Sequence, residues 1–256
     1  MNVRHLFTKL LLPVLILLSG ATSVAAAQDF DTDPDWKISA YLWATGLDGT
    51  LGIGPIEADV DVGFSDLLSS LDFGGALAVR RDWGANMLVG DLTYISLSPD
   101  DQPGPAGSTI SSDLDLTLFN TYYGRKWGSA DRYGALLVGA RYMKMDLGMS
   151  AAFDLPGEPV LKKGGSPSFT DFLIGGMFGT ELSTKWDMFL QGDVGVGGSN
   201  NSWNAQIMFQ RKLNSGNRID IGARVMSVDF DEKLANGDLF TLDATMTGLM
   251  FGFTWD

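Results

Sequence analysis

The chain has 256 residues, with 31 acidic against 18 basic side chains and a formal net charge of −13 at pH 7. A chain this acidic repels phosphate backbones, which argues against nucleic acid as a partner. The sequence contains no cysteine, and this excludes a disulfide framework, thiolate metal sites and a lipid anchor on cysteine.

The first 27 residues predict a secretory signal peptide. Arg4 and Lys9 precede the apolar run LLLPVLILL, and an A-x-A cleavage site occupies residues 25–27. The segment is too short and too close to the N-terminus to be a membrane anchor. We therefore expect export, followed by a mature chain, residues 28–256, that forms a single domain.

Ten segments of the mature chain alternate between apolar and polar residues, and a 3.6-residue helical period is almost absent. Alternation with a period of two predicts β-strands with two different faces. Frequent glycine, at 32 residues, also suits strands and turns better than long helices. In chain order the predicted strands are 36–45, 73–82, 85–97, 113–126, 132–147, 169–183, 187–197, 202–213, 217–230 and 239–255.

Short and long connections alternate between these strands. The sequences RDWGA, KWGSADR, STKWD and LNSGN suit tight hairpins. The connections 46–72, 98–112, 148–168 and 231–238 are longer, with GGSNNS as a short exception. The pattern predicts an all-β, antiparallel, up-and-down transmembrane β-barrel of about ten strands, or eight as the alternative, with short periplasmic turns and longer extracellular loops.

Four charged residues stand in apolar runs one or two positions after a glycine: Asp91, Arg141, Asp193 and Arg224. In a membrane barrel, alternate residues face lipid and lumen, so these charges can point inward at low cost. We expect further lumen charges on the same face of neighbouring strands, at Arg80, Asp113, Asp115, Arg125, Asp171, Glu181 and Asp220. Because buried charges must pair or be hydrated, the lumen holds either a salt-bridged plug or a narrow polar conduit.

Aromatic residues favour the membrane interpretation over a soluble barrel with an apolar lumen, such as a lipocalin-like carrier. Trp36, Trp83, Trp127 and Trp186 fall at strand starts or short turns and predict an interfacial girdle at one end of the barrel. The last strand sets Phe251, Phe253 and Trp255 on one face.

The last strand resembles the C-terminal signal by which outer-membrane barrels are recognised for assembly, although Asp256 follows the final aromatic residue. The sequences YLWATGLDGTLG, FSDLLSSLDFGG and RRDWG, within residues 36–97, resemble the opening of an uncharacterised Gram-negative outer-membrane barrel family, similar in style to OmpA-like and OmpW-like small barrels. The resemblance implies the fold, an outer-membrane location, and contact with membrane lipid, lipopolysaccharide and the barrel-assembly machinery. It implies no activity.

Catalysis by a histidine base is excluded, because the only histidine, His5, lies in the predicted signal peptide. Acidic residues occur without the spacing of a calcium loop, and no glycine-rich stretch leads into a phosphate-binding helix, so no metal and no cofactor are expected. The sequence predicts a monomeric, non-enzymatic barrel with an envelope-structural or surface-interaction role. A narrow passive channel for small solutes and a soluble periplasmic ligand-binding barrel are the alternatives.

Overall fold

The computed structural model describes residues 30–54, 56–63, 71–98, 102–103, 108–153 and 161–256. The predicted signal peptide lies outside the described residues. In the part that is described, no helix is long and apolar enough to cross a membrane. The strands are β1 (Asp35–Ile53), β2 (Ile56–Val62), β3 (Leu71–Trp83), β4 (Asn86–Leu97), β5 (Gln102–Pro103), β6 (Ser108–Gly128), β7 (Arg132–Phe153), β8 (Leu161–Gly165), β9 (Ser168–Ser183), β10 (Trp186–Val196), β11 (Asn201–Lys212), β12 (Arg218–Lys233) and β13 (Leu239–Trp255).

Ten of these strands form a closed antiparallel barrel. Their order around the barrel is β1, β3, β4, β6, β7, β9, β10, β11, β12 and β13, and β13 pairs with β1 to close it. Strands that follow one another among the ten are therefore paired, and the first and last strands, β1 and β13, pair with each other, as an up-and-down barrel requires. The predicted fold class and strand number are confirmed.

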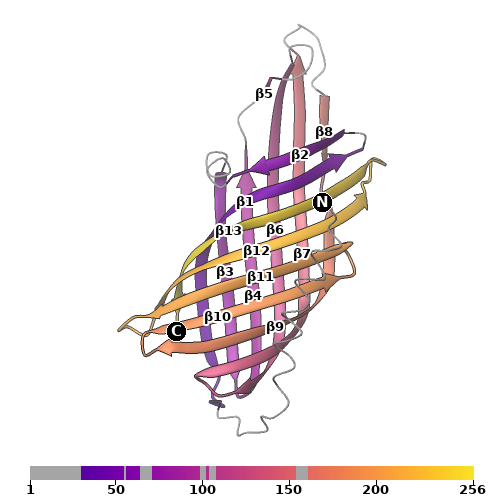
Figure 1. Cartoon of the computed structure of the whole chain (residues 1–256). Helices are drawn as coiled ribbons and strands as arrows, with labels where there is room; N and C mark the ends of the chain where they lie inside the picture. The colour runs from indigo at the N-terminus through magenta and orange to yellow at the C-terminus, as the bar shows by residue number, and fades with distance from the viewer. Residues whose placement is uncertain (1–29, 55, 64–70, 99–101, 104–107, 154–160) are drawn as a thin grey trace, which may run out of the picture.

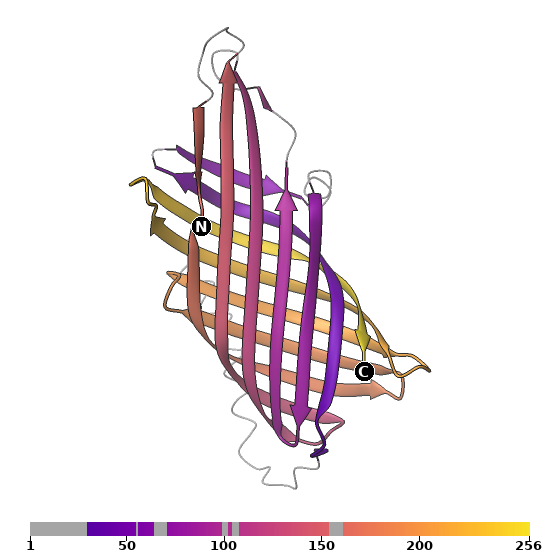
Figure 2. The same cartoon turned by 180° about the vertical axis from the view of Figure 1, so that it is seen from behind.

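The strands continue into the predicted long loops. β1 extends to Ile53 and forms a hairpin with β2, while β6 and β7 pair from Ser108↔Phe153 down to Gly128↔Tyr133. In Figures 1 and 2, β6 and β7 rise beyond the other barrel strands at the end opposite the C-terminus. We call this end the loop rim, and the end with the short turns the turn rim.

Toward the turn rim, side chains alternate between an exposed apolar exterior and a buried interior. On β12, Ile219 and Ile221 are exposed, whereas Asp220 and Arg224 are buried. On β1 the outward apolar positions run from Trp36 to Ala44, close to the length of about 9 to 11 residues that a tilted membrane strand requires. The exposed members of the apolar exterior on the first strands include Ile38, Leu42, Leu77, Leu88, Leu92, Phe119, Leu136 and Val138.

Toward the loop rim, the two faces exchange character. On β13 the exterior changes from Leu249 to Thr245 and Asp243, while the interior changes to Met246 and Leu242. The same exchange occurs on β12, where Asp229 is exposed and Phe230 is buried. The loop half of the barrel is thus built like a soluble protein, with polar residues outside and an apolar interior.

Candidate functional site

A closed ring of six polar side chains crosses the middle of the lumen. Its first half is Asp91, Asn120 and Arg141, which lie directly opposite one another on β4, β6 and β7. The Asn120 amide donates to Asp91 at 3.2 Å, and Arg141 Nε donates to the Asn120 carbonyl oxygen at 2.9 Å. Arg141 and Asn120 are buried, so these bonds replace water as their partners.

The second half of the ring repeats the same residue types on β10, β11 and β12. Asn204 donates to Asp193 at 3.1 Å, and Arg224 Nε donates to the Asn204 carbonyl oxygen at 2.7 Å. Two ion pairs join the halves. Arg141 Nη2 lies 2.6 Å from Asp193 Oδ1, and Arg224 Nη1 lies 3.5 Å from Asp91 Oδ1. We call these six residues the polar ring.

Two tyrosines and an indole complete the contacts of the polar ring. The hydroxyl of Tyr122 donates to Asp193 at 3.0 Å, and that of Tyr41 donates to Asp91. The Arg224 guanidinium lies 4.7 Å from the centroid of the Trp43 ring. Each buried charge thus has polar or aromatic partners, as buried charges require to be tolerated.

Asp171 ties the polar ring to the turn between β10 and β11. Its carboxylate accepts bonds from the backbone amides of Gly198 and Ser199 and from the hydroxyls of Ser199 and Ser202. Ser202 in turn accepts a bond from Arg141 Nη1 at 2.9 Å. Gly195 permits this approach, because a Cβ there would lie 2.3 Å from the Ser202 hydroxyl oxygen.

Buried apolar side chains fill the lumen between the polar ring and the loop rim. The rings of Phe169 and Phe230 lie 4.9 Å apart between centroids, and those of Phe230 and Phe240 lie 6.1 Å apart. This filling, which we call the apolar core, differs from the polar lumen that the sequence predicts. Its other buried members include Trp43, Leu116, Leu118, Met143, Met145, Met226, Val228, Leu242, Met246 and Met250.

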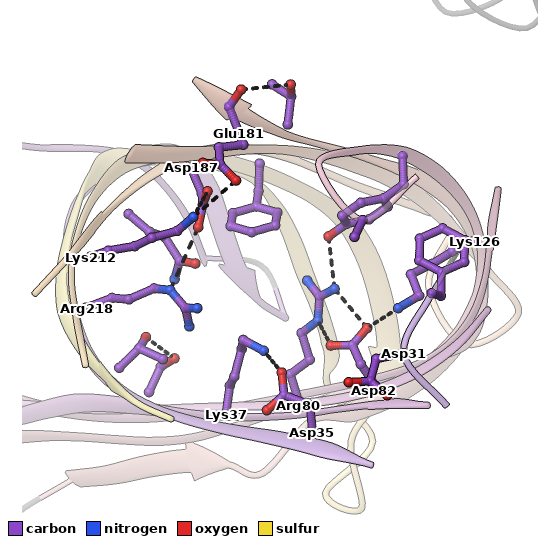
Figure 3. A pocket seen from close by; sticks show the side chains of 18 of the residues that line it. Asp31, Asp35, Lys37, Arg80, Asp82, Lys126, Glu181, Asp187, Lys212 and Arg218 are labelled. Carbon is purple, nitrogen blue, oxygen red and sulfur yellow. Dashed lines mark hydrogen bonds and ion pairs between the residues drawn. The ribbon is translucent and has the colours of Figure 1, made fainter. Parts of the chain in front are cut away.

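A charged pocket of about 350 Å³ opens at the turn rim, and we call it the vestibule. Arg80 donates to Asp82 at 2.6 Å and to the Tyr133 hydroxyl at 2.9 Å, and Lys126 donates to Asp82 at 2.8 Å. On the opposite wall, Lys212 lies 3.0 Å from Asp187. Figure 3 shows these side chains facing one another across the pocket, with acids and bases on both walls.

The chain before β1 contributes to the vestibule. Phe30 lies edge-on to Tyr133 with 6.4 Å between ring centroids, and the Lys126 ammonium lies 4.7 Å from the Phe30 centroid. The Gly84 amide donates to the Asp31 carbonyl oxygen at 2.7 Å. The segment is thus attached to the wall of the mouth.

The charges predicted for the lumen fall into three groups. Asp91, Arg141, Asp193 and Arg224 form the polar ring together with two asparagines, and Asp171 is joined to it through Ser202. Arg80, Glu181 and Asp220 lie nearer the turn rim: Arg80 and Glu181 line the vestibule, and Asp220 accepts bonds from Gln210 and Thr254 beside it.

Arg125, Asp113 and Asp115 do not face the lumen. Arg125 and Asp113 are exposed, and Arg125 donates to Asn86 at 2.9 Å. Asp115 accepts a bond from Tyr94, an exposed outward residue of β4. The inward face of β6 carries Leu116, Leu118, Asn120 and Tyr122 instead. Because the strand runs past both ends of the apolar exterior, its outward face can hold charges at either end.

A repeat in the sequence could have revealed the asparagines of the polar ring. VGARYMKMD at 138–146 and IGARVMSVD at 221–229 share the pattern G-A-R-x-M-x-x-D. Each is preceded, on the neighbouring strand, by an asparagine that bonds its arginine: Asn120 for Arg141 and Asn204 for Arg224. The side chains of Tyr41, Tyr122 and Ser202 carry no comparable signal.

The four predicted girdle tryptophans lie at the turn rim. Trp36 is 51% exposed, and Trp127 and Trp186 are also exposed, whereas Trp83 is half-buried. On β13, Phe251 and Trp255 are exposed and Phe253 lies 4.8 Å from Trp255 between ring centroids. The aromatic residues therefore cluster where the apolar exterior ends.

Within the described ranges, no group of three or more His, Asp or Glu side chains is arranged to hold a metal ion. The polar ring pairs acids with bases and amides, and the vestibule pairs carboxylates with ammonium and guanidinium groups. Such an arrangement links neighbouring and opposite strands through paired charges.

No protein-family model matches the sequence, and a comparison with curated proteins finds no match. Among solved structures, a FadL homologue of Pseudomonas aeruginosa is 7% identical, with 91% of this chain and 95% of that chain covered and a TM-score of 0.30. The toluene transporter TodX of P. putida is 8% identical, covering 87% and 90%, with a TM-score of 0.29. The translocator domain of the autotransporter NalP from Neisseria meningitidis is 13% identical, covering 96% and 95%, with a TM-score of 0.30. Likeness at this level is too weak to assign a function.

Proposed function

We propose that the protein is a non-enzymatic outer-membrane β-barrel with a closed lumen, which serves an envelope-structural or surface-interaction role. The observation that carries the proposal is the polar ring, in which three buried charges, Arg141, Asp193 and Arg224, and the partly buried Asp91 bond to one another across the middle of the lumen. The exterior of the barrel at that level is apolar. Signal-directed export, outer-membrane insertion and a monomeric state belong to the same proposal.

The exterior supports insertion in a membrane. Side chains such as Leu42, Leu136 and Phe251 are exposed at 57%, 49% and 45%, around a lumen where Arg141 is fully buried. A soluble carrier would reverse this arrangement at the level of the polar ring, because water stabilises exposed charges and an apolar ligand needs an apolar cavity. The exposed tryptophans at the turn rim suit the membrane–water interface.

Two successive barriers support a closed lumen. The polar ring joins β4, β6 and β7 to β10, β11 and β12 through ion pairs and amide bonds. Beyond it, the apolar core packs side chains such as Phe169, Phe230 and Phe240. A hydrated ion that entered from the vestibule would have to break buried ion pairs and then lose its water among apolar groups.

The expected partners follow from this placement. Membrane lipid covers the apolar exterior, lipopolysaccharide surrounds the loop rim, and the barrel-assembly machinery recognises β13. The loop half projects beyond the apolar exterior, so it offers a folded surface to molecules outside the cell. The exposed residues of this surface include Asp48, Asp113, Asp229 and Asp243, so it is acidic.

Conductance of purified protein in planar bilayers tests the closed lumen. We expect no stable current steps at physiological salt. Reproducible unitary conductance would favour the alternative function, a narrow channel for small solutes. The observation in favour of that alternative is the vestibule, which opens the lumen at the turn rim. Val138→Ala, a change on the outward face, is the control variant, and its conductance should match that of the wild type when equal amounts of protein are inserted.

Flotation with liposomes and heat-shifted mobility on gels test membrane insertion. A membrane barrel floats with the vesicles and migrates differently when it is boiled. Recovery of folded protein in the aqueous fraction without detergent would favour the soluble alternative.

A further inference from the structure

The Arg81 side chain lies on the exterior of the turn rim between two tryptophans. Trp36 on β1 pairs directly with Arg81 on β3, and Trp83 is the next outward residue of β3. The Arg81 guanidinium carbon lies 5.0 Å from the centroid of the Trp36 ring and 5.5 Å from that of Trp83. Both indoles hold the guanidinium by cation–π contacts at the edge of the apolar exterior.

The Arg81 Nε atom is buried and has no hydrogen-bond partner. A buried N–H without a partner costs free energy, and within the described residues no protein acceptor bonds this end of the guanidinium. The neighbouring carboxylate, Asp82, points to the opposite side of the sheet, where it binds Arg80 and Lys126 in the vestibule. Arg81 is therefore a cation without a carboxylate partner among the described residues.

Charges on the exterior are distributed unequally between the two rims. At the turn rim, three outward strand positions carry arginines that lie over aromatic rings. They are Arg81 over Trp36 and Trp83, Arg132 over Phe178, and Arg211 over Trp186. No described outward strand position at this rim is acidic. At the loop rim, by contrast, exposed outward residues include Asp48, Asp113, Asp229 and Asp243. The turn rim therefore has a positive exterior on an acidic protein.

We propose that Arg81, Trp36 and Trp83 form a binding site for the phosphate of an anionic phospholipid headgroup in the leaflet next to the short turns. A guanidinium binds phosphate through parallel N–H donors, and its charge strengthens those bonds. The indoles reach into the acyl-chain boundary and shield the contact from water. The site rests on the proposed membrane insertion.

The positive exterior favours an anionic lipid over a zwitterionic one. The choline or ethanolamine group of a zwitterionic headgroup brings a positive charge close to Arg81 with no outward carboxylate nearby to receive it. The glycerol of phosphatidylglycerol carries no charge, so its phosphate keeps the full attraction of the arginine. Phosphatidylglycerol is therefore the probe of choice, with phosphatidylcholine as its zwitterionic counterpart.

Native mass spectrometry of the folded barrel, released from detergent with equal amounts of phosphatidylglycerol and phosphatidylcholine, tests the site. We expect the wild type to retain phosphatidylglycerol preferentially, and Arg81→Gln to retain about tenfold less of it, the size expected for losing a charged hydrogen bond. Arg81→Lys, which keeps the charge without the planar fork, should fall between them. Lys144→Gln at the loop rim is the matched control and should match the wild type.

Equal retention of phosphatidylglycerol by the wild type and Arg81→Gln would overturn the site, and so would equal retention of the two lipids by the wild type. Flotation and heat-shifted mobility are measured on the same samples. A wild type that does not float with liposomes contradicts the proposed function itself. A wild type that floats but shows no lipid preference contradicts only the site. If Arg81→Gln does not fold, the comparison of Arg81→Lys with the wild type decides.

Discussion

Arg141 Nη2 lies 2.6 Å from Asp193 Oδ1, and both side chains are 0% exposed. The two residues belong to β7 and β10, between which β9 lies in the barrel wall. The ion pair therefore bridges strands that do not pair with each other. Together with the Arg224–Asp91 pair, it restrains the cross-section of the barrel at the level where the exterior is apolar.

The first prediction concerns this pair. Arg141→Leu leaves the Asp193 carboxylate without its cation and leaves Asn120 and Ser202 without their donor. Removing one member of a buried ion pair costs about 3 to 5 kcal/mol. We expect the unfolding midpoint of the barrel in detergent to fall accordingly in a urea or thermal titration.

The double variant Arg141→Leu/Asp193→Leu should recover part of the lost stability, because two apolar side chains leave no unpaired charge. Val138→Leu on the exterior of the same strand is the control and should change the midpoint little. A more stable Arg141→Leu would contradict the inward placement of the arginine, since removing a guanidinium stabilises a barrel only on its lipid face.

The orientation of the barrel gives the second prediction. Single cysteines at Ser129 and Thr184, in the short turns, should stay unlabelled when intact cells meet an impermeant thiol reagent. A cysteine at Asn236, in the exposed turn between β12 and β13 at the loop rim, should be labelled. The chain has no cysteine of its own, so each signal reports one site. The reverse labelling pattern would mean that the short turns face outward.

Much of the fold is encoded in local patterns of the sequence, and the exceptions have physical causes. On β6, large apolar residues lie on both faces, Leu116 and Leu118 inward and Phe119 and Tyr123 outward, so alternation cannot choose the lumen side. On β1, the apolar alternation stops near Ala44, because Gly46, Asp48 and Thr50 follow where the exterior becomes polar. The predicted strand therefore ends well before Ile53.

The polar ring was predictable in part. A charge inside an apolar run indicates an inward position, and this reasoning identified Asp91, Arg141, Asp193 and Arg224. It did not identify Asn120 and Asn204, because amides occur on either face of a strand. The apolar core was missed for another reason: Phe230 and Phe240 are compatible with a lipid-facing or an inward position until the neighbouring strands are placed.

The third prediction concerns assembly. Phe253→Ser with Trp255→Ser removes the aromatic pair at the end of β13, and we expect the yield of folded barrel in the outer-membrane fraction to fall sharply. Thr241→Ser, on the same face of β13 but at the loop rim, serves as the control. Unchanged amounts of heat-shifted protein in the membrane fraction would argue against recognition of this strand end.

The last prediction locates the membrane boundary on β13. Leu249 is 53% exposed within the apolar exterior. Thr245 lies four residues nearer the loop rim on the same outward face of β13, where the exterior is polar. An arginine near the middle of the bilayer costs roughly 2 to 4 kcal/mol, and one near the interface about 0 to 1 kcal/mol. Leu249→Arg should therefore destabilise the barrel in lipid vesicles, measured by unfolding in urea, much more than Thr245→Arg. In both variants the new side chain leaves the polar ring and the apolar core untouched, so the difference between them reports depth in the membrane. Equal effects would mean either that lipid covers both positions, so that the membrane extends past the level where the exterior becomes polar, or that lipid covers neither position.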